Sequence, residues 1–194
     1  MSAADHWNDH YQQGKGFRPV TETEVALLAK RLGPGTGHRA LDLGCGTGEY
    51  TAALHRLGFA TTGVDFSEVA VNTAQDRHHD RDGLDFRLLD TDRGGLTLLP
   101  AGEFDLITCR LFLPFVDLVP TVACTRRLLT PGGRLLVTTP LAERQRAGRE
   151  SIGLRPAALD LLRSFGWATT AEYPLDSLLC LLLTTHPAPE RTSR

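Results

Sequence analysis

Two kinds of hydrophobic pattern alternate along the chain. Short apolar runs are typical of buried strands, and segments whose apolar residues recur every three to four positions are typical of amphipathic helices. The runs predict strands at about 38–43, 60–65, 84–89, 104–109, 134–139, 167–173 and 178–185. The periodic segments predict helices at about 21–32, 48–57, 67–78, 117–129 and 155–166. Such alternation predicts a doubly wound parallel sheet with helices on both faces.

Polar residues mark where several of these elements begin and end. Thr21-Glu22-Thr23-Glu24 has the spacing of a capping box, and the apolar face of the helix that follows includes Ala29. Ser67 stands at the N-cap position of a later helix. The last two strands are separated only by residues 174–177, which is too short for a parallel crossover. The sequence therefore predicts an α/β fold with a seven-stranded sheet whose last strand is antiparallel.

Charge and hydropathy argue against two classes of partner. The formal net charge is −2 and no stripe of Lys or Arg is present, which disfavours nucleic acid. The longest apolar run, at 178–183, is too short to span a membrane. The polar N-terminus does not resemble a signal peptide, and the four cysteines form no C-x-x-C pair. We therefore expect a cytoplasmic protein with reduced thiols.

Three alternate glycines follow the first predicted strand directly and precede a helix. They are Gly44, Gly46 and Gly48. Glycine adds no Cβ and tolerates positive φ, so a ligand can lie directly against the backbone N–H groups of such a loop. The helix that follows points its partial positive end at the same place. The pattern predicts a site for a nucleotide-type cofactor.

The glycine spacing and a neighbouring carboxylate indicate which kind of cofactor. Dinucleotide-binding loops have the pattern G-x-G-x-x-G, whereas here Gly48 comes one position early. Asp42 stands two positions before Gly44, where it would repel a pyrophosphate and attract an ammonium group. The loop therefore favours a ligand that carries a positive charge.

The string LDLGCGTG at 41–48 resembles motif I of class I S-adenosylmethionine-dependent methyltransferases. Later motifs of this family follow in order: Val64-Asp65-Phe66 ends the second strand, Leu89-Asp90-Thr91 ends the third, and Leu128 to Val137 resembles the turn into strand five. The resemblance covers about Arg39 to His186. It implies S-adenosylmethionine as cofactor and S-adenosylhomocysteine as product.

The resemblance also implies roles for individual residues. Asp42 and the glycine loop would hold the methionine portion, Asp65 would accept both ribose hydroxyls, and Asp90 with Thr91 would bind the adenine. The expected cofactor-binding residues are Asp42, Gly44, Cys45, Gly46, Gly48, Asp65, Phe66, Asp90, Thr91, Cys109, Arg110 and Tyr11. We expect one domain, with an N-terminal helical lid at 1–35, a Rossmann-like core at 36–186 and a flexible tail at 187–194.

Departures from the family's subgroups narrow the substrate. Catechol-type enzymes carry a metal-binding acid after strand four, where this chain has Cys109-Arg110, so we expect no metal. The Asp/Asn-Pro-Pro-aromatic motif of DNA amino-methylating enzymes and the paired glutamates of arginine methyltransferases are also missing. A small organic molecule is the substrate class that remains. The sequence leaves a monomer and a homodimer equally open.

The substrate side is less defined. The N-terminal segment contains Trp7, Tyr11, Phe17 and Arg18, and Tyr11 either closes over the sulfonium or, with the other rings, covers a hydrophobic surface. The aromatic stretch Phe112-Leu113-Pro114-Phe115 either lines a pocket or packs in the core. Charged residues at 141–154, among them Glu143, Arg144, Arg146, Arg149 and Glu150, form either a substrate gate or a solvated loop.

We expect in-line methyl transfer to an oxygen, nitrogen or carbon atom, in which alignment supplies most of the rate. The candidate bases are His6 and His10, and Arg110 is a candidate to orient an anionic substrate; surface roles are the alternative for all three. His78-His79-Asp80 is interpreted as a solvated helix end. Two other functions stay open: a protein that binds S-adenosylmethionine without methyl transfer, and an NAD-dependent oxidoreductase.

Overall fold

A single seven-stranded sheet forms the centre of the molecule in a computed structural model that describes residues 3–16, 18–91, 94–148 and 152–189. The strand order is β3-β2-β1-β4-β5-β7-β6. The strands are β1 (Arg39–Leu43), β2 (Ala60–Asp65), β3 (Leu84–Leu88), β4 (Phe104–Arg110), β5 (Leu129–Pro140), β6 (Thr169–Leu175) and β7 (Leu178–Thr184). Strands β1 to β5 pair in parallel, and β7 is antiparallel to both β5 and β6, which confirms the prediction.

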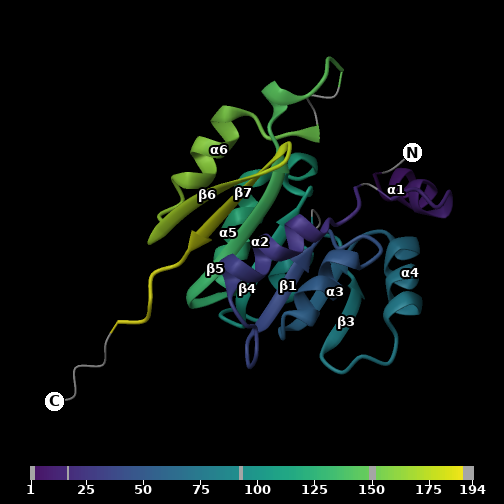
Figure 1. Cartoon of the computed structure of the whole chain (residues 1–194), viewed down its shortest axis with the longest axis horizontal. Coiled ribbons are helices and arrows are strands. Elements are labelled where there is room, and N and C mark those ends of the chain that lie inside the picture. Colours follow the sequence, from purple (N-terminus) through teal and green to yellow (C-terminus); the bar gives the residue numbers. More distant parts are fainter. Residues whose placement is uncertain (1–2, 17, 92–93, 149–151, 190–194) are drawn as a thin grey trace.

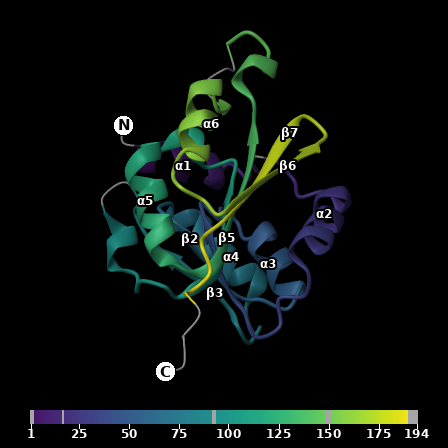
Figure 2. The same cartoon turned by 90° about the vertical axis from the view of Figure 1, so that its left-hand side faces the viewer.

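Helices cover both faces of this sheet (Figures 1 and 2). The helices are α1 (Ala3–Gln12), α2 (Glu22–Leu32), α3 (Glu49–Arg56), α4 (Glu68–His78), α5 (Leu118–Leu128) and α6 (Pro156–Arg163), with 3-10 turns η1 (Gly95–Leu98), η2 (Leu113–Phe115) and η3 (Ala142–Arg144). Leu28 of α2 and Leu54 of α3 pack in one cluster with Leu106 of β4. Val122 of α5 and Leu162 of α6 pack on the opposite face. The predicted two-sided arrangement is therefore confirmed.

Two strands differ from the expected bounds. β5 begins at Leu129, so Pro131-Gly132-Gly133 lies inside the strand rather than in a turn before it, and its pairing with β4 shifts register there. β6 extends to Leu175, which leaves only Asp176 and Ser177 to join it to β7. Asp176 adopts a φ of +50°, a left-handed conformation that suits a two-residue hairpin turn.

Helix α1 lies in the segment expected to form an N-terminal helical lid, but the sequence predicted no bounds for it, since the first helix with a clear pattern begins near Thr21. Its residues are mostly polar, so tertiary contacts hold it in place. The Ser67 hydroxyl, at the start of α4, donates a hydrogen bond of 2.7 Å to the Asn8 side chain. Trp7 packs edge-on against Phe115 of η2, with ring centroids 5.5 Å apart. α1 therefore spans from α4 to the segment after β4.

The start of α2 confirms the predicted cap and shows a different use of its glutamate. The Thr21 hydroxyl accepts a hydrogen bond from the Glu24 backbone N–H at 3.2 Å. The Glu24 side chain does not return to the cap but is buried against Arg110. Ala29, expected on the apolar face, is exposed, because Glu24, Leu28 and Leu32 are the buried positions.

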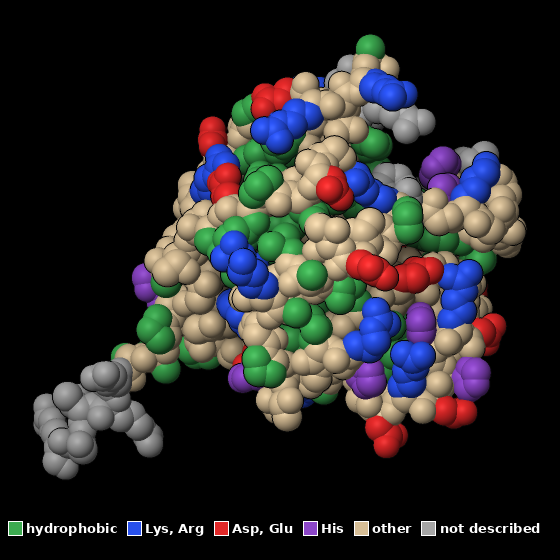
Figure 3. All heavy atoms as spheres, viewed as in Figure 1, with side chains coloured by type: hydrophobic (Ala, Val, Ile, Leu, Met, Phe, Trp, Pro, Cys, Tyr) green, Lys and Arg blue, Asp and Glu red, His purple; other side chains and the backbone are tan. Residues whose placement is uncertain are grey.

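Two observations concern the surface. Among the described residues on the face drawn in Figure 3, basic and acidic side chains are interspersed and form no continuous basic stripe. Within the described ranges, the helices are all too short or too polar to cross a bilayer.

Candidate cofactor and acceptor site

A cavity of about 1090 Å³ lies at the carboxyl ends of the parallel strands. Its walls come from α1, from the segment that leads into α2, from the glycine loop after β1, and from the residues that follow β2, β3 and β4. Ligands of doubly wound sheets bind at this edge. The volume lies at the upper end of the range for small-molecule sites, about 300–1,000 Å³. The cavity is therefore large for a small-molecule site.

In the glycine loop at this edge, Gly44 and Gly46 have no space for a Cβ atom. Gly44 and Gly46 have φ values of +70° and +53°, which favour glycine. A Cβ on Gly44 would lie 2.6 Å from the Phe112 ring, and one on Gly46 would lie 2.9 Å from the Tyr11 hydroxyl oxygen. The two glycines thus let aromatic residues from distant segments approach the loop backbone.

The backbone N–H groups of the loop bond within the protein, which corrects the expectation that they face the ligand. Gly44 and Cys45 donate to the Val64 carbonyl at 2.9 and 3.0 Å, and Gly48 donates to Cys45 at 3.1 Å. Gly46 donates to Asp65 Oδ2 at 2.9 Å. A pyrophosphate needs such donors free. The geometry therefore agrees with the glycine spacing in disfavouring a dinucleotide.

Asp65, the last residue of β2, presents its carboxylate to the cavity. Its side chain is fixed by two backbone amides, because Oδ1 accepts from Ser67 N at 2.9 Å and Oδ2 accepts from Gly46 N. Burial raises the pKa of Asp65, and these hydrogen bonds oppose the rise. Each carboxylate oxygen keeps a further acceptor position. Both carboxylate oxygens of Asp65 thus keep the capacity to accept a further hydrogen bond.

Asp42 occupies a different position although it is also near a strand end. The register pairs Asp42 with Gly63, two residues before Asp65, which places it about 7 Å deeper in the sheet. It is 1% exposed and accepts hydrogen bonds of 2.7 Å from the hydroxyls of Thr51 and Thr108. Burial raises the pKa of Asp42 to about 6. The structure does not bring this carboxylate to the cavity wall.

The other expected cofactor-binding residues fall into two groups. Those that line the cavity together with Asp65 are Gly44, Cys45, Gly46, Phe66, Asp90, Thr91, Arg110 and Tyr11. Those that do not are Asp42, Gly48 and Cys109. Cys109 is buried in the core, and its burial raises the pKa of the thiol. Ligand contact by members of the first group stays a prediction.

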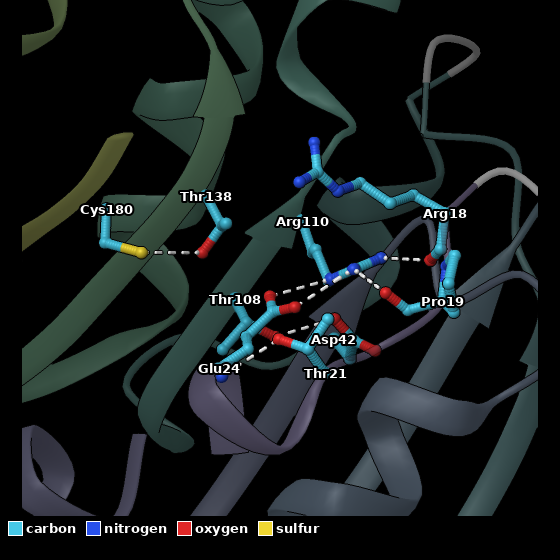
Figure 4. A network of polar contacts seen from close by, with 9 residues as sticks. All are labelled: Arg18, Pro19, Thr21, Glu24, Asp42, Thr108, Arg110, Thr138 and Cys180. Carbon is cyan, nitrogen blue, oxygen red and sulfur yellow. Dashed lines mark hydrogen bonds and ion pairs between the residues drawn. The ribbon is translucent and has the colours of Figure 1, made fainter. Parts of the chain in front are cut away.

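Arg110 at the end of β4 makes four hydrogen bonds to protein groups, which use four of its five N–H donors (Figure 4). Its Nε and Nη2 donate to the two Glu24 oxygens at 2.8 and 3.0 Å. Its Nη1 and Nη2 donate to the carbonyls of Arg18 and Pro19 at 3.0 and 3.1 Å. The Arg110 and Glu24 side chains are only 10% and 3% exposed. Arg110 therefore clamps the chain before α2 onto the sheet, and the expectation that it orients an anionic substrate is not supported.

Helix α1 lies over the glycine loop. Tyr11 lines the cavity beside Gly46, and burial together with the nearby Asp65 charge raises the pKa of Tyr11. Trp7 and Phe115 line the cavity as well. Phe17, expected in the same aromatic group, lies outside the described residues. Leu113, expected beside Phe112 and Phe115, is buried in the core instead.

The structure places several histidines differently from what the sequence predicted. His6 and His10 are on α1 but not on the cavity wall, and burial lowers the pKa of His10. His78, interpreted as part of a solvated helix end, lines the cavity and stacks on Phe86 at 5.7 Å. Burial lowers the pKa of His78. The interpretation holds only for its exposed neighbours His79 and Asp80.

Sequence reasoning missed one arm of the cavity, a groove between α2 and α3. Val25, Ala26 and Ala29 of α2 form one side, and Ala52 and Arg56 of α3 form the other. These residues, most of which are small, form no sequence motif. The groove therefore becomes visible only when the two helices are packed together in the structure.

The segment 141–154 does not line the cavity over its described part. The Ala142 N–H donates to the Leu154 carbonyl at 2.9 Å, and the Leu154 N–H donates to the Pro140 carbonyl at 2.9 Å. Glu143, Arg144 and Arg146 are exposed. Arg149 and Glu150 lie outside the described residues. Of the two interpretations, the solvated loop fits the described residues. Within those residues no three His, Cys, Asp or Glu side chains form a metal-binding group.

Comparisons with known proteins agree with this fold. A family model described as "Methyltransferase domain" matches residues 41–137. The ubiquinone biosynthesis O-methyltransferase of Methylococcus capsulatus is 36% identical over 139 residues, which are 71% of this chain and 58% of that protein. The ribosomal protein L11 methyltransferase of Thermus thermophilus is 34% identical over 148 residues, which are 74% of this chain and 55% of that protein.

The chain thus spans less than two thirds of the length of these relatives. A crystal structure of an S-adenosylmethionine-dependent methyltransferase from Mesorhizobium loti has the same fold, with a TM-score of 0.66 and 21% identity over 84% of this chain and 97% of that chain. The matched family region contains the glycine loop, Asp65 and Arg110. The chain belongs to the methyltransferase domain family of class I S-adenosylmethionine-dependent enzymes.

Proposed function

We propose that this protein transfers a methyl group from S-adenosylmethionine to an oxygen, nitrogen or carbon atom of a small organic molecule, without a metal. The observation that carries the proposal is one continuous cavity with two kinds of wall. Gly44, Gly46 and Asp65 lie at its cofactor end, and Trp7, Phe112 and Phe115 form an adjoining aromatic end, where the Phe112 ring approaches Gly44. This combination supports the binding of a cofactor and an acceptor in one chamber.

The residues at the cofactor end fit this cofactor. The loop has no side chains at Gly44 and Gly46, and a Cβ at either position would collide with an aromatic residue. Asp65 is held by two amides with acceptor positions left for the ribose hydroxyls. The loop carbonyls are the natural partners of an ammonium group, since four loop N–H groups are already bonded. Asp42 would act at longer range, through its charge.

The aromatic end supplies alignment and exclusion of water. The bound cofactor provides an electrophilic methyl group on a sulfonium. Tyr11 and Trp7 of α1 cover the cavity, and Phe112 and Phe115 face it from the segment after β4. Aromatic faces attract cations. Correct alignment of two reactants in a dry site is worth about 7–11 kcal/mol. We assign no catalytic base, since His6 and His10 stand off the wall.

Isothermal titration calorimetry and methyl-label transfer test the proposal together. We expect S-adenosylhomocysteine to bind in the micromolar range, and purified protein with labelled cofactor to transfer label into a low-molecular-weight fraction of a metabolite extract. Absence of binding would refute the proposal. Binding without transfer to any acceptor would favour a protein that binds the cofactor without methylating. Label on a protein band would favour a protein substrate, as the name of the Thermus relative suggests for that enzyme.

Three further expectations belong to the same proposal. The reaction should resist a metal chelator, because the end of β4 carries Cys109 and the Glu24-bound Arg110 rather than carboxylates. The cytoplasm is the expected compartment, since all four cysteines are free thiols. Size-exclusion chromatography with light scattering would decide between a monomer and a homodimer.

A further inference from the structure

The residues that line the cavity include aromatic rings and two arginines. Phe112 and Phe115 come from the segment after β4. Arg18 lies on the chain between α1 and α2, and Arg110 ends β4. An inference about the acceptor rests on the proposed function and depends on which of these cations is available.

Arg110 is not available to bind an anionic group of the acceptor. Four of its hydrogen bonds go to Glu24 and to the carbonyls of Arg18 and Pro19. Its charge is balanced by the buried Glu24 carboxylate. An arriving anion would have to break a bidentate pair, and removing one partner of such a pair is strongly unfavourable.

Arg18 differs from Arg110 in what surrounds its guanidinium. Its Nη1 donates one hydrogen bond of 3.1 Å to the Ser177 hydroxyl in the β6–β7 turn. Among the described residues no carboxylate forms an ion pair with it. A guanidinium has five N–H donors in a planar fork, so most of this fork is left for a ligand. Arg18 is half-buried and lines the cavity.

The Glu24–Arg110 pair fixes the position from which Arg18 projects. The Arg18 carbonyl accepts from Arg110, whereas its guanidinium extends away from the pair (Figure 4). The backbone of Arg18 is thus anchored at the sheet edge and its head group is held at the β6–β7 turn. A cation anchored at both ends and lacking a counter-charge is a suitable receptor for a carboxylate, which an arginine fork binds in a bidentate manner.

We propose that Arg18 binds an anionic group, a carboxylate, on the methyl acceptor, so that the substrates are small aromatic or otherwise apolar acids. The aromatic wall of Phe112 and Phe115 receives the apolar body, and Arg18 fixes the end that is not methylated. Arg110 and Glu24 act as positioning residues for Arg18.

Matched pairs of ligands that differ only in charge test the proposal. The probes are 3,4-dihydroxybenzoate and 3,4-dihydroxybenzamide, indole-3-acetate and indole-3-acetamide, each titrated into protein saturated with S-adenosylhomocysteine. We expect at least one acid to bind about tenfold or more tightly than its amide, the usual effect of a charge-assisted hydrogen bond. In Arg18→Met the ratio should fall below about threefold, while Arg18→Lys retains part of it.

Arg144→Met is the matched control, because Arg144 is exposed on η3 and away from the cavity. It should keep the wild-type ratio. The inference is overturned if acids and amides bind equally to the wild type, if no acid binds, or if Arg18→Met keeps the preference. Binding of S-adenosylhomocysteine is measured first in every variant. Its absence in the wild type refutes the proposed function itself, so the two failures are distinguishable.

Discussion

The two ends of the cavity are built in different ways. The cofactor end comes from a short stretch of chain, since the glycine loop and Asp65 occupy adjacent tips of β1 and β2. The acceptor end joins three segments far apart in sequence, represented by Trp7, Arg18 and Phe115. The cofactor end depends on local backbone geometry, whereas the acceptor end depends on a buried ion pair and on ring contacts that hold the segments together.

Because the two ends are built differently, we expect mutations at each end to impair different properties of the protein. Damage to the tip of β2 should weaken cofactor binding strongly and leave the contacts of the N-terminal segment in place. Damage to the contacts of the N-terminal segment should cost stability or lid closure and leave the cofactor contacts in place.

The largest expected effect comes from the Glu24–Arg110 ion pair, which anchors the acceptor end. Glu24→Ala leaves the buried Arg110 charge without its partner, which should lower the free energy of unfolding by about 3–5 kcal/mol. Urea denaturation measures this change. Glu22→Ala is the control, because Glu22 is exposed on the same turn and should change stability by no more than about 0.5 kcal/mol. A loss below about 1 kcal/mol in Glu24→Ala would contradict the role of the pair as an anchor.

Asp65→Ala should destroy the cofactor end selectively. The change removes an acceptor for two hydroxyls and leaves the N–H groups of Gly46 and Ser67 unpaired, so we expect the Kd for S-adenosylhomocysteine to rise about 100-fold or more. Calorimetry measures the Kd. Asp85→Ala, at an exposed carboxylate on β3, should leave it unchanged. A rise of less than threefold in Asp65→Ala would contradict the assignment.

Asp42 should act on stability through pH. Its folded-state pKa, about 6, lies above the usual aspartate pKa of 3.8, so its contribution to stability is largest below pH 4 and is lost as the pH rises through 6. Asp42→Asn does not titrate. The stability of this variant relative to wild type should therefore increase by about 2 kcal/mol between pH 4.5 and 7.5. An equal difference at both pH values would show that Asp42 titrates normally.

The smallest effect concerns the lid. Phe115→Leu removes the edge-to-face contact with Trp7, which is worth about 1 kcal/mol. Amide hydrogen exchange in α1 should become about fivefold faster, with an unchanged affinity for S-adenosylhomocysteine. Val119→Ala, at an exposed position on α5, should leave exchange in α1 as in the wild type. Unchanged exchange in Phe115→Leu would mean that the ring pair does not hold α1.

The contrast between local backbone geometry and contacts between distant segments also explains which features the sequence predicted. Strand positions, the antiparallel β7 and Asp65 follow from local patterns and glycine spacing. The depth of Asp42 could not be predicted, because it depends on the register with Gly63. α1 has a polar sequence and is held by contacts such as Asn8 with Ser67, which no local pattern indicates. The ion pair between Arg110 and Glu24 could not be predicted either, because the capping-box pattern places the Glu24 side chain at its own helix cap.

A crystal of the wild-type protein soaked with S-adenosylhomocysteine tests the central claim most directly. We predict ligand density above the ends of β1 and β2, with the ribose hydroxyls within hydrogen-bond distance of Asp65 and the amino-acid portion along the loop at Gly44 and Gly46. Density elsewhere in the molecule, or no density at a concentration that saturates the protein in solution, would contradict it.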